Sequence, residues 1–145
     1  MNKFLEYYSD EIKRYGGINN YVIFKSIEKK PLLDRIRKYA KNKKDILEAG
    51  CGSAANSIFL ANNGFNVTCI DNNPEILKFA SSNSSRFDNS PIFLKKDILR
   101  LPYLNRLFDV SFSHGVLEHY ADDNIVNLIK TISNSKNVSI NKYYD

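Results

Sequence analysis

The chain has 145 residues, of which 43% are hydrophobic and 12% aromatic, and this fits one soluble globular domain with its own core. The N-terminus lacks the apolar segment of a signal peptide, and no apolar run approaches the length of a membrane span. Its two cysteines, Cys51 and Cys69, form neither a metal-binding spacing nor a disulfide framework. We therefore expect free thiols, a reducing compartment and a cytoplasmic protein.

The net charge of +5 is unevenly distributed along the chain. Residues 1–47 hold twelve Lys and Arg against six Asp and Glu, whereas residues 48–145 hold nine against ten. The basic excess could contact phosphates or an acidic substrate. Because no aromatic platform or RNA-binding signature accompanies it, we interpret it as a solvated helix surface and expect no nucleic-acid partner.

Helical patterns fill the first part of the chain. Residues 2–15 predict an amphipathic helix that a Gly-Gly pair ends. A second helix is expected to begin at a cap on Asn19 or Asn20, and Pro31 should kink or restart it. The apolar side of this second helix should comprise Val22, Ile23 and Ile27. We expect residues 1–43 to cover one side of a ligand pocket, as a lid.

A strand, a glycine turn and a helix follow. Residues 45–49 are a short apolar run with one acid, typical of a strand buried on both faces of a parallel sheet. Residues 50–52, Gly-Cys-Gly, then turn the chain, and a helix is expected over residues 53–63 with Gly64 at its C-cap. Glycine lets the backbone approach a ligand closely, so this unit indicates a nucleotide-like cofactor.

The same alternation continues downstream. Further strands are expected at residues 67–70, 92–94 and 107–113, with helices starting at residues 72–75 and 122–123. This order predicts a Rossmann-like, open and mainly parallel α/β sheet with helices on both faces. Ligands of such sheets bind beyond the carboxyl ends of the strands. The residues expected at that edge are Gly50, Asp71, Asp97 and Ser113.

The glycine turn fits two cofactors. Residues 50–55 match the dinucleotide fingerprint G-x-G-x-x-A, with Asp71 about 20 residues further on for a ribose. That reading gives an NAD(P)-binding oxidoreductase. With Glu48 included, residues 48–54 read E-x-G-x-G-x-A, which resembles motif I of the class I S-adenosylmethionine-dependent methyltransferases. Ala54 stands where that family often has a third glycine.

Three more segments resemble the small-molecule branch of that family, with methyltransferase domains of types 11 and 25. They are residues 71–72, 96–98 and 108–119. The cofactor-binding residues that the resemblance implies are Glu48, Gly50, Cys51, Gly52, Asp71, Asn72, Asp97, Ile98, Ser113 and His114. In this assignment Asp71 binds the ribose hydroxyls, and Asn72 flanks the adenine. Residues 97–98 read the edge of the adenine.

Charge favours the same cofactor. An acid at the first turn would repel a pyrophosphate, whereas Glu48 would attract a sulfonium or an ammonium group. Methyl transfer is an in-line displacement that alignment and desolvation can accelerate, so no dedicated nucleophile is required.

His114 and His119 are candidate general bases for the acceptor. The alternative for His119 is a structural role in the loop after the fourth strand.

The resemblance covers residues 30–140, and a complete domain of this family has seven strands. Residues 137–140 look like a fifth strand just beginning. We therefore expect a C-terminally truncated cofactor-binding domain over residues 44–145, lacking the last strands, that could self-associate through the exposed strand edge.

The expected function is methylation of an unidentified small-molecule acceptor, with S-adenosylmethionine as cofactor and S-adenosylhomocysteine as product. A non-catalytic cofactor-binding module is a further alternative, and we expect no metal.

Overall fold

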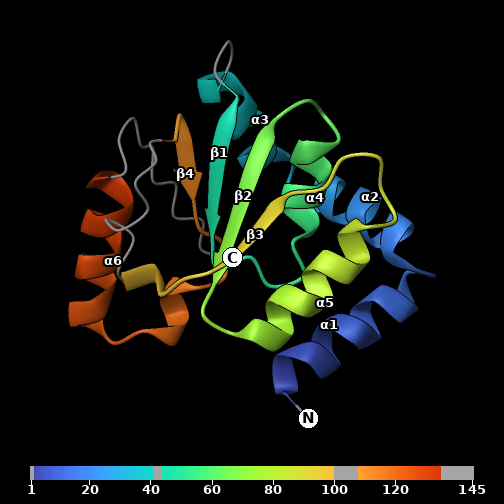
Figure 1. The fold of residues 1–145 in the computed structure, drawn as a ribbon, viewed down its shortest axis with the longest axis horizontal. Coiled ribbons are helices and arrows are strands. Elements are labelled where there is room, and N and C mark those ends of the chain that lie inside the picture. The colour runs from blue at the N-terminus through green and yellow to red at the C-terminus, as the bar shows by residue number, and fades with distance from the viewer. Residues whose placement is uncertain (1, 41–43, 100–107, 135–145) are drawn as a thin grey trace.

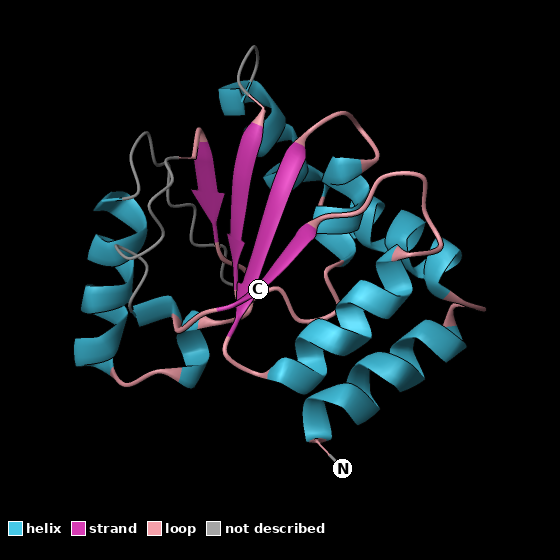
Figure 2. Ribbon diagram, in the orientation of Figure 1, coloured by secondary structure: helices cyan, strands magenta, loops and turns pink. Residues whose placement is uncertain are grey.

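The computed structural model describes residues 2–40, 44–99 and 108–134. Figure 1 and Figure 2 show one sheet with helices on both faces. The elements are α1 (Lys3–Arg14), α2 (Ile18–Glu28), α3 (Lys30–Ala40), β1 (Asp45–Ala49), α4 (Ala55–Ala61), β2 (Asn66–Asp71), α5 (Pro74–Ser84), β3 (Ile92–Lys95), β4 (Val110–Phe112), the 3₁₀ helix η2 (Leu117–His119) and α6 (Asp122–Asn134). Among these residues, no helix combines the length and the apolar character needed to cross a bilayer.

The four strands lie in the order β3-β2-β1-β4, and every neighbouring pair is parallel. This confirms the predicted Rossmann-like sheet, in which helices connect parallel strands. β1 is central, since Glu48 pairs with Cys69 of β2 on one side and with Phe112 of β4 on the other. All four strands therefore direct their carboxyl ends toward the same edge.

Each face of the sheet has its own core. Side chains alternate along a strand, so Ile46 joins one cluster and Leu47 the other. The Ile46 cluster packs against α2, α3, α4 and α5, whereas the Leu47 cluster includes Leu128 of α6. Figure 1 shows α6 on one side of the sheet and α4 with α5 on the other. The alternation places Glu48 on the same face as Ile46, toward α4.

The N-terminal helices form much as predicted, apart from the start of α2. Gly17, with φ 119°, is its N-cap, and the predicted caps Asn19 and Asn20 lie inside the first turn. The predicted apolar side is correct for Val22 and wrong for Ile23 and Ile27, which are 59% and 69% exposed. The residues that α2 buries are Ile18, Tyr21 and Val22. The restart at Pro31 is confirmed, since α3 begins at Lys30.

Backbone conformation and capping hydrogen bonds set the ends of α4 and the start of α5. α4 begins two residues later than predicted, because Ala54 adopts a left-handed conformation with φ 59°. Gly64, with φ 90°, follows the helix, and the Phe65 amide donates to the Leu60 carbonyl at 3.2 Å. The Asn73 side chain caps α5 as predicted, accepting from the Glu75 amide at 2.9 Å. The predicted fifth strand at residues 137–140 lies outside the described residues.

Candidate functional site

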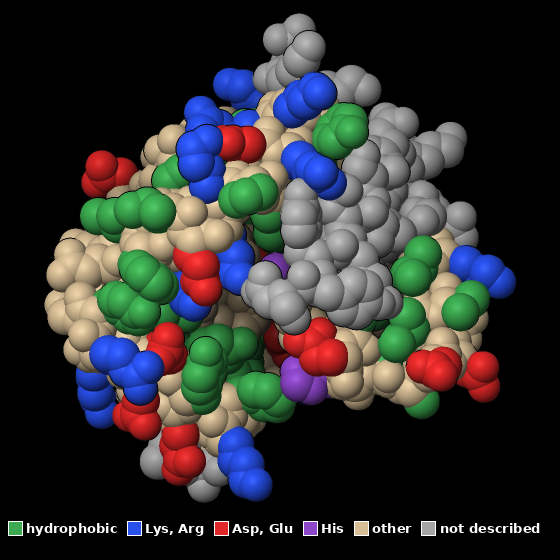
Figure 3. Space-filling view, turned by 180° about the vertical axis from the view of Figure 1, so that it is seen from behind, with side chains coloured by type: hydrophobic (Ala, Val, Ile, Leu, Met, Phe, Trp, Pro, Cys, Tyr) green, Lys and Arg blue, Asp and Glu red, His purple; other side chains and the backbone are tan. Residues whose placement is uncertain are grey.

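A cavity of about 920 Å³ lies at the carboxyl ends of the strands, with α1 and α2 on its other side. Figure 3 shows acidic, basic and histidine side chains gathered around a hollow on this face of the molecule. Most of the predicted site residues meet here. Those that line the cavity are Glu48, Gly50, Cys51, Gly52, Asp71, Asn72, Ile98, His114 and His119.

Two predicted residues make local contacts and are not among those that line the cavity. The Asp97 carboxylate accepts from the Leu99 amide at 3.0 Å, which fits the turn it occupies after β3. The Ser113 hydroxyl donates to the Ala49 carbonyl at 2.9 Å and so joins the ends of β4 and β1. Both residues thus lie at the predicted edge of the sheet, and both side chains are hydrogen-bonded to backbone groups.

The glycine turn has a conformation and a packing that side chains would disrupt. Gly50 and Gly52 have φ of 77° and 51°, in the left-handed region. A Cβ atom on Gly50 would lie 2.4 Å from Cγ2 of Val116, and one on Gly52 would lie 2.3 Å from the Tyr8 hydroxyl oxygen. The turn is therefore pressed between α1 and the loop after β4.

Glu48 is the most deeply buried acid of the cavity, with 3% of its surface exposed. It accepts a hydrogen bond from the Ser57 hydroxyl of α4. Burial raises the pKa of Glu48 to about 8, although hydrogen bonds from Ser57 and Asn56 lower it. Glu48 is consequently protonated at neutral pH, and it gains its charge only when a cation or a higher pH favours the ionised form.

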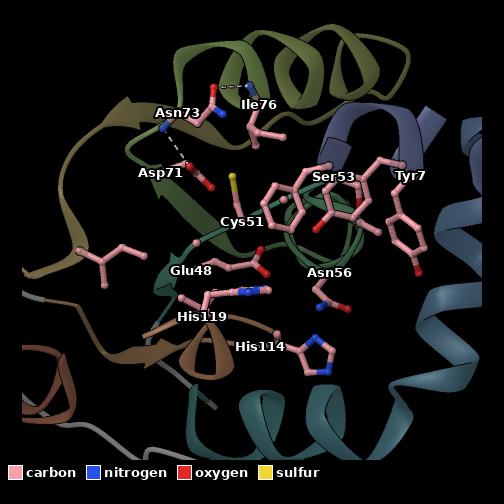
Figure 4. A pocket seen from close by; sticks show the side chains of 18 of the residues that line it. Tyr7, Glu48, Cys51, Ser53, Asn56, Asp71, Asn73, Ile76, His114 and His119 are labelled. Atoms are coloured by element: carbon pink, nitrogen blue, oxygen red, sulfur yellow. Dashed lines mark hydrogen bonds between the residues drawn. The ribbon is translucent and has the colours of Figure 1, made fainter. Parts of the chain in front are cut away.

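Asn56 lies beside Glu48 on α4 and also lines the cavity (Figure 4). Its side-chain oxygen is buried and, within the described part of the chain, has no hydrogen-bond partner. A buried acceptor without a partner is costly, and a donor from a ligand would satisfy it. Glu48 and Asn56 together thus offer acceptors to a positively charged N–H group.

Asp71 lies across the turn from Glu48, at the end of β2 (Figure 4). Its carboxylate accepts from the Asn73 amide at 3.0 Å, which ties the acid to the first turn of α5. Burial raises the pKa of Asp71, while backbone hydrogen bonds from Asn73, Gly52 and Asn72 lower it. The carboxylate is thus held in place by the backbone at the border of the cavity.

α1 crosses the cavity and touches both of its ends. At one end, the Phe4 ring meets the His119 ring edge-on, with 5.4 Å between centroids. At the other, Tyr8 lies against Gly52, and burial, with Tyr21 and Glu48 nearby, raises the pKa of Tyr8 well above its usual range. Sequence reasoning gave α1 a covering role but missed Tyr8 as a residue of the site. The four-residue step from Phe4 to Tyr8 on one helix face was the available signal.

The two thiols lie close together behind the turn. Both are free and buried, and burial, with Cys51 beside it, raises the pKa of Cys69 well above its usual range. A raised pKa makes the Cys69 thiol a poor nucleophile. In the described part of the chain, no group of three or more His, Cys, Asp and Glu side chains could hold a metal ion.

Comparison with known proteins identifies the family and the fold of the chain. The family described as "Methyltransferase domain" matches residues 46–135. No curated protein sequence matches the chain. Among solved structures, magnesium protoporphyrin IX methyltransferase from Synechocystis PCC 6803 with bound SAM is 20% identical with a TM-score of 0.62, over 76% of this chain and 56% of that one.

A second solved structure, the N-methyltransferase NodS from Bradyrhizobium japonicum WM9 with S-adenosylhomocysteine, is 24% identical with a TM-score of 0.58. The match covers 72% of this chain and 53% of that one. At these identities the likeness establishes the fold. The chain matches little more than half the length of either protein.

The buried Glu48 carboxyl predicts an unusual pH dependence of stability. Its folded pKa of about 8 lies above the ordinary 4.5, so folding favours the protonated form. This contribution is fully present below pH 4.5 and is lost as the pH rises to 8, at about 1.4 kcal/mol per pH unit. We expect Glu48→Gln to flatten the decline of the free energy of unfolding in urea between pH 5 and 7.5.

Glu75→Gln is the matched control, because Glu75 is exposed in the first turn of α5. This control should show the same decline of the free energy of unfolding with pH as the wild type. A Glu48→Gln variant that declines as steeply as the wild type would show that Glu48 does not titrate in this range.

Proposed function

We propose, since the chain belongs to the methyltransferase-domain family, that it binds S-adenosylmethionine and transfers the methyl group to a small-molecule acceptor. The observation that carries this proposal is the pairing of two acids, Glu48 and Asp71, around a close-packed glycine turn inside one cavity. A sulfonium and an ammonium group are both cations, and this edge of the sheet offers carboxylates to them. The product would be S-adenosylhomocysteine.

The conformation of the turn and the polar groups beside it support the binding of this cofactor. Positive φ at Gly50 and Gly52 lets the backbone approach the methionine portion. The orphaned oxygen of Asn56, beside Glu48, is suited to accept from the ammonium group. Neither the matched family pattern nor the glycine spacing had pointed to Asn56.

The nucleoside portion would lie toward the other side of the turn. Asp71 is suited to the ribose hydroxyls, because its carboxylate is already fixed by the Asn73 amide. Asn72 and Ile98 border the cavity where the adenine would lie. Asp97 would act from the turn after β3, and the backbone carbonyl of residue 113 or 114 would accept from the adenine amino group.

The chain's own residues would accelerate transfer through position and exclusion of water. When bound, the cofactor supplies an electrophilic methyl group on sulfur. α1 covers one side of the cavity through Phe4 and Tyr8 and would limit the access of water to it. His114 and His119 line the cavity as candidate general bases for an acceptor hydroxyl or amine. Because the two cysteines form no disulfide framework and are both buried, we also propose a reducing, cytoplasmic location.

A nicotinamide-dependent oxidoreductase is less compatible with this site. The pyrophosphate of a dinucleotide commonly binds at a helix N-terminus and is repelled by nearby carboxylates. Here α4 has seven residues and begins only after the left-handed Ala54. Glu48 is buried directly beneath the turn. A short helix that starts late is a poor fit to a pyrophosphate, and Glu48 would favour a cation once it is ionised.

Parallel calorimetric titrations with S-adenosylmethionine, S-adenosylhomocysteine and NAD test the choice of cofactor. We expect binding of the first two and no heat from NAD, because Asp71, and Glu48 once a cation has ionised it, attract a cation and repel a pyrophosphate. Tight binding of NAD, with silence from the other two, would replace the methyltransferase by the oxidoreductase. Binding of both sulfur compounds without turnover of any acceptor would favour a non-catalytic module.

The close approach of the glycine turn is tested by Gly52→Ala, with Gly64→Ala as its control. Both glycines have positive φ, so each change costs about 1 to 2 kcal/mol of folding free energy. A Cβ atom on Gly64 meets nothing within 4 Å, whereas one on Gly52 would lie 2.3 Å from the Tyr8 hydroxyl oxygen and would displace that ring at the cavity. We expect Gly52→Ala to weaken S-adenosylmethionine binding about tenfold or more and Gly64→Ala to leave the dissociation constant unchanged. Equal affinities would remove the turn from the site.

A further inference from the structure

Cys51 and Cys69 are the only two cysteines of the sequence, and neither thiol takes part in the proposed transfer. The Gly50 amide of the turn donates to the Ile70 carbonyl of β2 at 2.8 Å. Cys51 follows that glycine and Cys69 precedes that isoleucine, so the two cysteines flank one hydrogen bond. Their side chains are themselves hydrogen-bonded to each other. The fold thus brings both thiols into contact beneath the glycine turn.

The cavity gives access to one thiol of the pair. Cys51 lines the cavity and 6% of its surface is exposed, whereas Cys69 in β2 has an exposed fraction of 0%. In the view of Figure 4, Cys51 lies between Asp71 and Glu48. A small solute that enters the cavity therefore meets the Cys51 sulfur, and Cys69 lies behind it.

Cys69 also lies beside the buried carboxyl of the site. It is the β2 partner of Glu48 in the register of the sheet, and the Ser57 side chain is hydrogen-bonded to both. A change of covalent structure at the thiol pair would therefore alter the surroundings of the acid on which the proposed cofactor site depends.

We propose that Cys51 and Cys69 form a redox modification site, at which a peroxide converts the contacting thiols to a reversible disulfide that weakens cofactor binding. The formation of the disulfide depends only on the contact between the thiols, whereas its effect on the cofactor rests on the proposed function. A reducing compartment keeps the pair as thiols until an oxidant enters the cavity.

The oxidation takes two steps, written here for hydrogen peroxide. The Cys51 thiolate attacks one oxygen, the O–O bond breaks, and Cys51 becomes a sulfenic acid, while the departing hydroxide takes up the thiol proton as water. The Cys69 sulfur then attacks the Cys51 sulfur, the S–O bond breaks, and the hydroxyl leaves as water with the Cys69 proton. The two thiols lose two electrons, which the peroxide gains. Burial raises the pKa of Cys69 and slows the second step, whereas contact between the reacting sulfurs favours it.

The disulfide would move the glycine turn. Its sulfurs lie about 2.05 Å apart, closer than two thiols in hydrogen-bond contact, so Cys51 has to shift toward β2. A Cβ atom on Gly50 would lie 2.4 Å from Cγ2 of Val116. One on Gly52 would lie 2.3 Å from the Tyr8 hydroxyl oxygen. Because both neighbours of Cys51 are packed this closely, the turn cannot absorb the shift, and its backbone would be displaced where the cofactor approaches.

The modification is tested by treating the folded chain with hydrogen peroxide at neutral pH and measuring the mass of the tryptic peptide of residues 45–78. This peptide holds both cysteines and lacks Met1, so its mass reports on the pair alone. We expect the loss of two hydrogens, no thiol left for iodoacetamide, and full reversal by dithiothreitol. Circular dichroism of the same samples checks that the chain stays folded.

Titration with S-adenosylhomocysteine connects the modification to the cofactor site. Saturation with this ligand should slow the oxidation about fivefold or more, because the ligand would cover Cys51 on its cavity side. The oxidised chain should bind S-adenosylhomocysteine about tenfold more weakly than the reduced chain, and dithiothreitol should restore the affinity.

Cys69→Ala removes the second thiol and leaves Cys51 at the cavity. Since this variant cannot form the disulfide, we expect its peptide to gain oxygen and to resist dithiothreitol, as a sulfinic acid does. Cys69→Ser serves the same purpose should the alanine variant fail to fold.

Two results would overturn the inference: a wild-type peptide that gains oxygen without losing two hydrogens, or thiols that react only after the chain is unfolded in urea. A disulfide that leaves the affinity for S-adenosylhomocysteine unchanged would overturn its effect on the cofactor. If the reduced chain does not bind that ligand at all, the proposed function is wrong, and the mass of the peptide still decides whether the two thiols form the modification site.

Discussion

The burial of the Glu48 carboxyl under the glycine turn is the constraint on which the site depends. The hydrogen bond from Ser57 joins the central strand to α4, so the acid fixes the helix that begins just beyond the turn. Burial keeps the acid protonated at neutral pH. In the free protein Glu48 is therefore a structural brace, and in the proposed complex it becomes the counter-charge of the cofactor. Glu48 can serve both purposes because burial favours its neutral form in the free protein, whereas the attraction of a cation at hydrogen-bond distance favours its ionised form.

Two groups of elements form the cavity around Glu48, the strand ends on one side and the helices before β1 on the other. The strand ends contribute acids because parallel strands deliver successive loops to one edge of the sheet. The helices before β1 contribute aromatic rings and lysines, and their position over the cavity comes from packing of α2 on α4 and of α1 on α2. The basic excess of the N-terminal segment, interpreted from sequence as a solvated surface, lies partly inside the cavity at Lys25 and Lys29.

The part of the site on the sheet was predictable and the part on the helices was not. Glu48, the glycines and Asp71 follow strands whose type and direction are fixed by local pattern, so their meeting point follows from topology alone. Tyr8 and Lys25 lie on helices whose place over the sheet depends on tertiary packing, which periodicity does not report. The same limit explains why Ile23 and Ile27 were placed on the apolar side of α2 although both are exposed. At Ala54 a left-handed residue shortened α4, and alanine gives no signal of that conformation.

The central claim, that Glu48 becomes charged when the cofactor binds, is tested most directly by counting protons. S-adenosylmethionine would be titrated calorimetrically at pH 7 in two buffers with different ionisation enthalpies, into the wild type and Glu48→Gln. Since the free carboxyl has a pKa of about 8, the account predicts release of about one proton by the wild type. Glu48→Gln should release none. Absence of release by the wild type, or the same release by both proteins, would contradict the account.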